Sequence, residues 1–162
     1  MVIHDMTAQE CRAMLARSNV AHLACVHENQ PYIVPIHVDL DHEFLYGFAT
    51  QGQKIDWMRH NPLVCLEMDE FSPDQWASVV VFGRYEELLH QPEYQDSRRL
   101  ALRLFERHPM WWQPATVPLA GQAQRAPVAF RIRIDRVTGR RGSNDAGKAR
   151  LQGIPSDASR PG

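Results

Sequence analysis

Residues 31–59 constrain the fold of this 162-residue chain more than any other stretch. They contain two runs of β-type residues on either side of a turn at Asp41-His42. A glycine-containing loop at residues 50–53 follows, and then a short helical segment that begins with Lys54. Neighbouring β-type runs joined by tight turns are typical of antiparallel sheets. The stretch therefore predicts an antiparallel arrangement that leads directly into a helix.

The loop before that helix is a candidate anion site. The first N–H groups of a helix have no partner within it, and the helix dipole favours a negative charge there. Gly52 lies in the loop, and Lys54 adds a mobile positive charge. We therefore predict that Gly52, Gln53 and Lys54 take a phosphate group. The alternative is a solvated lysine, which the helix dipole would slightly disfavour.

The rest of the chain predicts further strands and helices with mostly hairpin connections. Predicted strands cover residues 19–26, a segment that starts at 31, 43–49, 63–68, 77–89 and 128–138, and predicted helices cover 7–17, 54–60 and 92–107. About six antiparallel strands remove their exposed edges by curling into a barrel. We predict a mainly β (α+β) fold, a closed or split antiparallel barrel of six strands with two or three flanking helices.

Residues 69–82 and Gly47 show local patterns that predict more than strand or helix. The run at residues 79–82 looks buried on both faces, and residues 69–76 read as a polar loop. Gly47, inside a predicted strand, indicates either a kink or the close approach of a flat ring.

The C-terminal third contains two stretches outside this pattern. Residues 109–127 form a long irregular stretch, and its Trp111 and Trp112 either anchor the loop or cover a ligand. From Arg140 onward the chain is rich in Gly, Ser, Arg and Pro. We predict one domain over residues 1–139 and a flexible basic tail over 140–162.

Composition excludes several classes of function. The hydrophobic fraction is 44%, the charged fraction 23% and the formal net charge −1, which argues against a general nucleic-acid binder. Every apolar run is far shorter than the ~20 residues of a membrane-spanning helix, and the N-terminus does not resemble a signal peptide. The three cysteines are far apart in sequence and are expected to be reduced. These features predict a cytoplasmic protein with no membrane or nucleic-acid partner.

The eight histidines raise the question of a metal or a haem. His22, His27 and His37 are predicted to lie on adjacent strands, but no cysteine or carboxylate completes a zinc set by spacing. We predict no metal site. The carboxylates Glu67, Asp69 and Glu70 are expected either in a solvated loop or as an acid/base pair.

Four sequence blocks occur in order and together resemble a known family. They are Pro31-Tyr32-Ile33-Val34-Pro35-Ile36, Gly52-Gln53-Lys54-Ile55-Asp56, Asn61-Pro62-Leu63-Val64-Cys65 and Ser78-Val79-Val80-Val81-Phe82-Gly83-Arg84. The order and spacing resemble the pyridoxamine 5′-phosphate oxidase-like, FMN-binding split barrels, and most closely their nitroimidazole-resistance (Nim-type) branch. The resemblance covers roughly residues 5 to 141.

The resemblance implies a homodimer of split barrels with an FMN at each of two sites along the subunit interface. It implies that Ile33, Val34, Pro35 and Ile36 line the flavin and that Phe48, Ala49 and Thr50 flank the ribityl chain. It also implies that Gly52, Gln53 and Lys54 take the phosphate and that Ser78 approaches the flavin from the other subunit.

The implied activity is that of an FMN-dependent oxidoreductase. A reduced nicotinamide nucleotide would supply hydride, and a small acceptor such as a nitro compound or quinone would be reduced; the sequence identifies no catalytic side chain. Alternatives are a non-catalytic flavin or haem binding module and a deazaflavin-dependent reductase. Oxidases of the family usually have an arginine where this chain has Tyr32, and the resemblance does not imply vitamin B6 synthesis.

Overall fold

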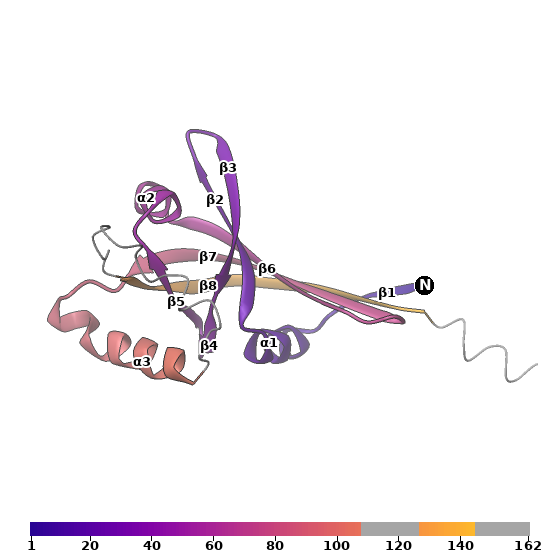
Figure 1. Cartoon of the computed structure of the whole chain (residues 1–162). Helices are drawn as coiled ribbons and strands as arrows, with labels where there is room; N and C mark the ends of the chain where they lie inside the picture. Colours follow the sequence, from indigo (N-terminus) through magenta and orange to yellow (C-terminus); the bar gives the residue numbers. More distant parts are fainter. Residues whose placement is uncertain (108–126, 145–162) are drawn as a thin grey trace, which may run out of the picture.

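The computed structural model describes residues 1–107 and 127–144 (Figure 1). Its three α-helices are α1 (Ala8–Arg17), α2 (Gln53–His60) and α3 (Gln95–Glu106), the last preceded by a short 3-10 helix, Pro92–Tyr94. The strands are β1 (Val2–Asp5), β2 (Val20–His27), β3 (Gln30–His37), β4 (Asp39–Asp41), β5 (Phe44–Thr50), β6 (Leu63–Phe71), β7 (Gln75–Glu87) and β8 (Pro127–Ser143).

All eight strands belong to one antiparallel sheet. The order is β3-β2-β6-β7-β8-β5-β4, and β1 pairs with the far end of β8. β3 also contacts β5, although the two strands are far apart in this order, so the sheet curls toward closure. The predicted mainly antiparallel split barrel is confirmed. The sheet has eight strands and not the predicted six. The two extra strands, β1 and β4, have only 4 and 3 residues, which are too few to show an alternating pattern in the sequence.

The core fills the inside of this curled sheet. Strand residues such as Leu23, Leu66 and Ile132 are fully buried there, and α2 contributes Ile55 and Met58. A second, smaller cluster lies under α3 and contains Tyr46, Leu88, Ala101, Leu104 and Ala129. Successive residues of β5 therefore serve different clusters, as expected for a strand that is covered on both faces.

Gly47 makes room for an aromatic ring of the protein itself. A Cβ atom at this position would lie 2.7 Å from Cζ of Phe130, which is 0% exposed. Gly47 and Phe130 are paired across β5 and β8. The close approach of a flat ring, one of the two predictions for Gly47, is therefore met inside the core by Phe130.

The hairpin of β6 and β7 is longer than predicted and forms an arm that extends from the barrel (Figure 1). The predicted loop over residues 69–76 is wrong, because β6 continues to Phe71 and β7 begins at Gln75. The predicted burial of residues 79–82 on both faces is also wrong. Val81 is 0% exposed but Phe82 is 38% exposed, because the described residues cover the outer face of β7 only in part, with Arg136 over the Phe82 ring.

β8 extends past the predicted domain boundary at residue 139 and reaches Ser143. Its end is held by β1 and by ion pairs of Arg140 with Asp5 (3.3 Å) and of Arg141 with Glu10 (2.9 Å). Residues 140–143 thus belong to β8, and the strand that pairs with them, β1, comes from the other end of the chain. Trp111, Trp112 and the remainder of the predicted tail lie outside the described residues. None of the helices in the described part is long and apolar enough to cross a membrane.

Candidate functional site

The N-terminus of α2 is an open corner at the end of β5. Gln51 and Gly52 link the strand to the helix, and within the described structure no side chain caps the first turn. A Cβ atom added to Gly52 would meet no described atom within 4 Å apart from those of its chain neighbours, so the space beside this residue is open. Asp56, in the first turn, accepts a hydrogen bond from Gln51 Nε2 at 2.6 Å. The helix begins at Gln53, one residue before the predicted Lys54.

Lys54 lies half-buried in the first turn of α2 and makes no salt bridge with any described residue. Its charge is close enough to affect Cys25 on β2. Burial raises the pKa of the Cys25 thiol, and the positive charge of Lys54 opposes that rise. A cation near a helix N-terminus, without a protein carboxylate partner, favours an anion at this corner.

The predicted residues of β3 divide between the two faces of that strand. Ile36 is 7% exposed and Val34 packs against the core, whereas Ile33 is 63% exposed and Pro35 is also exposed. The alternation follows from the period of two along a strand. Within the sheet β3 is an edge strand, which agrees with the prediction drawn from Pro35.

The side chain of Tyr32 packs against α2 at this corner. Its ring lies 5.5 Å from that of Trp57 on α2. The ring of His27 packs in a tilted arrangement against those of Trp57 (5.8 Å) and His60 (5.0 Å). These aromatic contacts fix α2 against the β2–β3 hairpin. The position at which the family's oxidases usually have an arginine is therefore part of an aromatic cluster in this chain.

The predicted residues of β5 lie at the end of that strand, directly before the loop that leads to α2. Phe48 is half-buried with its ring 5.0 Å from that of Phe105 on α3, Ala49 is buried and Thr50 is exposed. The structure thus brings Thr50, Gly52, Gln53 and Lys54 together at one site. Their proximity follows from continuity of the chain.

Ser78 lies elsewhere, on β7 in the arm, where it is paired with Asp69 on β6. Its hydroxyl donates a 2.7 Å hydrogen bond to Glu67 Oε1. Ser78 is also one of the residues that line a hollow of about 580 Å³ between β7, the end of β8 and the N-terminal segment. Within one chain, Ser78 therefore does not join the α2 corner.

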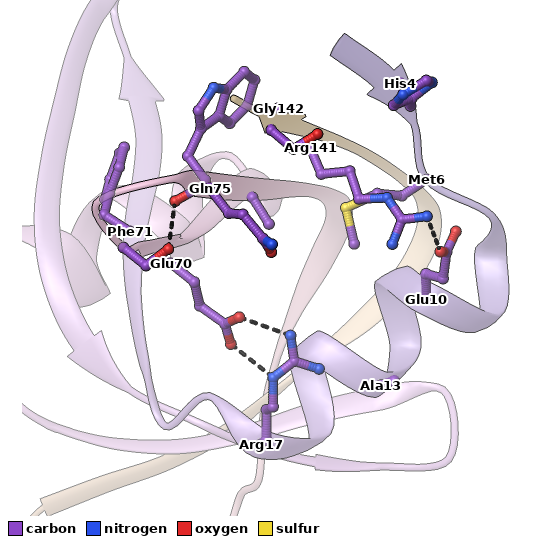
Figure 2. A pocket seen from close by; sticks show the side chains of 14 residues that line it. His4, Met6, Glu10, Ala13, Arg17, Glu70, Phe71, Gln75, Arg141 and Gly142 are labelled. Atoms are coloured by element: carbon purple, nitrogen blue, oxygen red, sulfur yellow. Dashed lines mark hydrogen bonds and ion pairs between the residues drawn. The ribbon is translucent and has the colours of Figure 1, made fainter. Parts of the chain in front are cut away.

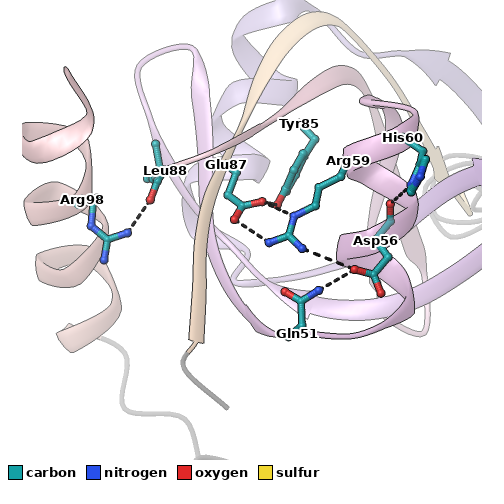
Figure 3. Close-up of polar contacts among 8 residues, drawn as sticks. All are labelled: Gln51, Asp56, Arg59, His60, Tyr85, Glu87, Leu88 and Arg98. Atoms are coloured by element: carbon teal, nitrogen blue, oxygen red, sulfur yellow. Dashed lines mark hydrogen bonds and ion pairs between the residues drawn. The ribbon is translucent and has the colours of Figure 1, made fainter. Parts of the chain in front are cut away.

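A network of charged side chains secures the other end of α2 (Figure 3). Arg59 donates two hydrogen bonds to Glu87 on β7, at 2.7 and 2.8 Å, and lies 3.5 Å from Asp56. Tyr85 donates its hydroxyl proton to Glu87 at 3.1 Å. Burial and the adjacent Glu87 carboxylate raise the pKa of Tyr85, so its hydroxyl stays protonated and remains a donor.

The Arg59–Glu87 contact predicts a pH-dependent contribution to stability. The hydrogen bonds from Arg59 lower the pKa of Glu87. A carboxylate with a lowered pKa stabilises the fold above its unfolded pKa of about 4.3, and this contribution is lost as the pH falls through the folded pKa. Glu87→Gln should therefore destabilise the protein at neutral pH, and the difference from wild type should shrink as the solution is acidified below about pH 4. Urea unfolding at several pH values tests this, and a constant difference would contradict it.

A hollow of about 640 Å³ lies between α1 and the tip of the arm (Figure 2). Two ion pairs line it: Arg17 with Glu70 at 2.7 Å and Arg141 with Glu10 at 2.9 Å. None of the predicted cofactor residues contributes to this hollow. Glu70 is committed to Arg17, which lowers the pKa of its carboxyl group, so the predicted acid/base grouping of Glu70 with Glu67 is not formed. Sequence reasoning missed both ion pairs, because their partners are far apart along the chain.

The chain belongs to the pyridoxamine 5′-phosphate oxidase family, whose pattern matches residues 7–141. This confirms the resemblance identified from the four sequence blocks.

Individual relatives support the same assignment. A solved structure of an FAD-binding protein from Mesorhizobium loti is 39% identical, with a TM-score of 0.76, and the match covers 88% of this chain and 100% of that one. An uncharacterized protein of Rhizobium meliloti is 42% identical over 144 residues, which cover 86% of this chain and 95% of the relative. A 5-nitroimidazole antibiotic resistance protein from Bacteroides thetaiotaomicron shares the fold, with a TM-score of 0.67 at 18% identity over 87% of this chain and 89% of that one.

Proposed function

We propose that this protein is an FMN-dependent oxidoreductase that holds the cofactor's phosphate at the N-terminus of α2. The observation that carries this proposal is the uncapped first turn, with Lys54 unpaired among the described residues and open space beside Gly52. Membership in the family and the description of the Mesorhizobium loti relative as FAD-binding support a flavin. FMN and FAD share the ring system and the ribityl phosphate, so the same corner serves either.

The bound flavin would pass electrons from a reduced nicotinamide nucleotide to a small acceptor, such as a nitro compound or quinone. The chain's own residues have simpler roles. Backbone N–H groups of Gln53 and Lys54 bind the phosphate together with the Lys54 ammonium group. The backbone of β3 with the exposed side chains of Ile33 and Pro35 would line the flavin ring. Phe48, Ala49 and Thr50 at the end of β5 would flank the ribityl chain. The resemblance of the four sequence blocks to the Nim-type branch is the reason for choosing a nitro compound as the acceptor.

We further propose that the working unit is a homodimer joined through the outer face of the sheet. The register places Ile33 beside Ala24, Ala24 beside Cys65, and Cys65 beside Phe82, which makes an apolar row across four strands. Ile33 is 63% and Phe82 38% exposed in the single chain. Ser78 lies on the same face of β7 as Phe82, four residues away, so a second copy on this face would bring it toward the partner.

The cellular location proposed for the enzyme is the cytoplasm. Its three cysteines, Cys11, Cys25 and Cys65, are all free thiols. This agrees with a reducing compartment.

Spectroscopy of the purified protein tests the proposed activity. We expect flavin absorption that is bleached by NADH or NADPH without oxygen and restored by a nitro compound or quinone. A flavin that neither nucleotide reduces would instead indicate a non-catalytic flavin module. A Soret band would indicate haem. Either result would overturn the proposed reaction.

A further inference from the structure

The outer face of the sheet gathers four polar side chains at one place. His22 on β2 is paired with Glu67 on β6, and Asp69, two residues further along β6, is paired with Ser78 on β7. Residues two apart on a strand point to the same face. Three neighbouring strands therefore place these side chains on one patch, although more than fifty residues separate the first from the last in sequence.

The distances within this patch suit a shared ligand. His22 Nδ1 lies 3.4 Å from Glu67 Oε2, and Ser78 donates its hydroxyl proton to the other oxygen of Glu67 at 2.7 Å. One ligand atom each from His22, Glu67 and Asp69 can be chosen so that all lie within 4.8 Å of one another. Small side-chain rotations bring such atoms to the 2.0–2.2 Å that zinc–nitrogen and zinc–oxygen bonds require.

The two carboxylates of the patch also favour the binding of a cation. Two carboxylates, those of Glu67 and Asp69, share one face of β6, and Asp69 has no ion pair or hydrogen-bond partner for its side chain in the described part of the chain. Arg140, across the sheet from Ser78, is paired with Asp5 at 3.3 Å. Among the described residues, the imidazole of His22 is the titratable group that contacts Glu67, and the two carboxylates repel each other.

We propose that His22, Glu67 and Asp69 bind one divalent transition-metal ion, with Zn²⁺ as its representative. An imidazole nitrogen with two carboxylate oxygens is a zinc-type donor set that leaves a coordination position for water or a substrate oxygen. Ser78 orients Glu67 from the second coordination sphere. The sequence-based prediction of no metal site relied on spacing along the chain, whereas here the sheet register assembles the ligands. All of them come from one chain, so binding does not require the proposed dimer.

Isothermal titration of the full-length, untagged protein with ZnCl₂, after dialysis against a chelator, tests the site. Wild type is expected to bind one Zn²⁺ per chain, and His22→Ala and Asp69→Asn should each weaken binding by about tenfold or more. His42→Ala is the matched control, because His42 is exposed and lies 3.0 Å from a single carboxylate, that of Asp41. Its affinity for Zn²⁺ should equal that of wild type.

Titration with Co²⁺ gives a second readout that does not depend on activity. Protein-bound Co²⁺ in a low-coordinate site shows visible d–d absorption, and His22→Ala should lose it while His42→Ala keeps it. Circular dichroism of each variant checks that the exposed substitutions leave the fold intact. Absence of stoichiometric Zn²⁺ binding, or equal affinities in wild type, His22→Ala and Asp69→Asn, would overturn the proposal. The flavin assignment would stand in either case, because it rests on Lys54 and the first turn of α2 and on none of these residues.

Discussion

Lys54→Ala is expected to weaken FMN binding roughly tenfold to a hundredfold, which corresponds to the ~1.5–3 kcal/mol of a hydrogen bond to a charged group. The fold should lose almost no stability, because Lys54 makes no salt bridge among the described residues and a cation near a helix N-terminus is slightly unfavourable. Fluorescence titration of the apoprotein with FMN measures the affinity, and urea unfolding without ligand measures the stability.

Two further variants make this test specific. Arg103→Ala removes one positive charge from an exposed position on α3 and should leave FMN affinity unchanged. Lys54→Arg retains the charge and should recover most of the binding. If Lys54→Ala binds FMN as tightly as Arg103→Ala does, the phosphate does not lie at this corner.

Gly52→Asp tests the same corner from the opposite direction. Gly52 is the N-cap of α2, and its φ of 170° is an extended conformation that any residue adopts. An aspartate there would cap the free N–H groups and should stabilise the unliganded protein by about 1 kcal/mol. The same carboxylate would occupy the space proposed for the phosphate and repel it. Higher stability together with weaker FMN binding would show that the first turn is kept uncapped for a ligand.

The parts of the fold that could be predicted from sequence depend on neighbouring residues. The capping box of Thr7 and Glu10 at the start of α1 is present, because both of its members lie within one helical turn. The two faces of β5 also follow from a local pattern: Phe44, Tyr46 and Phe48 pack in one core cluster, and Leu45 and Ala49 belong to the other. The α2 corner could be predicted from the sequence for the same reason, since Thr50, Gly52 and Lys54 are close neighbours along the chain.

The features that sequence reasoning missed depend on register between distant strands. β6 was predicted too short, and β7 was predicted to begin two residues too late, because Asp69 and Gln75 look like loop residues. Polar side chains are nevertheless tolerated on the open face of an arm. Likewise, only the pairing of β2 with β6 brings His22 to Glu67. Periodicity along one strand identifies which residues share a face, but not which residue of another strand lies beside them.

Phe130→Ala is expected to be the most destabilising single substitution argued here, at about 3–5 kcal/mol. Phe130 is 0% exposed, and its ring packs 5.6 Å from that of Tyr85 and directly over Gly47. Removing the ring leaves a cavity that the rigid backbone of Gly47 has no side chain to fill. Urea unfolding of the unliganded protein measures the loss.

Phe71→Ala is the matched control, because Phe71 at the tip of the arm is 76% exposed and its loss should change stability by no more than about 0.5 kcal/mol. Gly47→Ala tests the same contact, because its new methyl group would lie 2.7 Å from Cζ of Phe130. The smaller side chain in Gly47→Ala/Phe130→Leu relieves that overlap. The double variant should therefore lose less stability than the sum of the losses in Gly47→Ala and in Phe130→Leu. β5 and β8 meet at this pair, and β5 leads into the α2 corner. If Phe130→Ala is no more destabilising than Phe71→Ala, the ring does not hold these strands together.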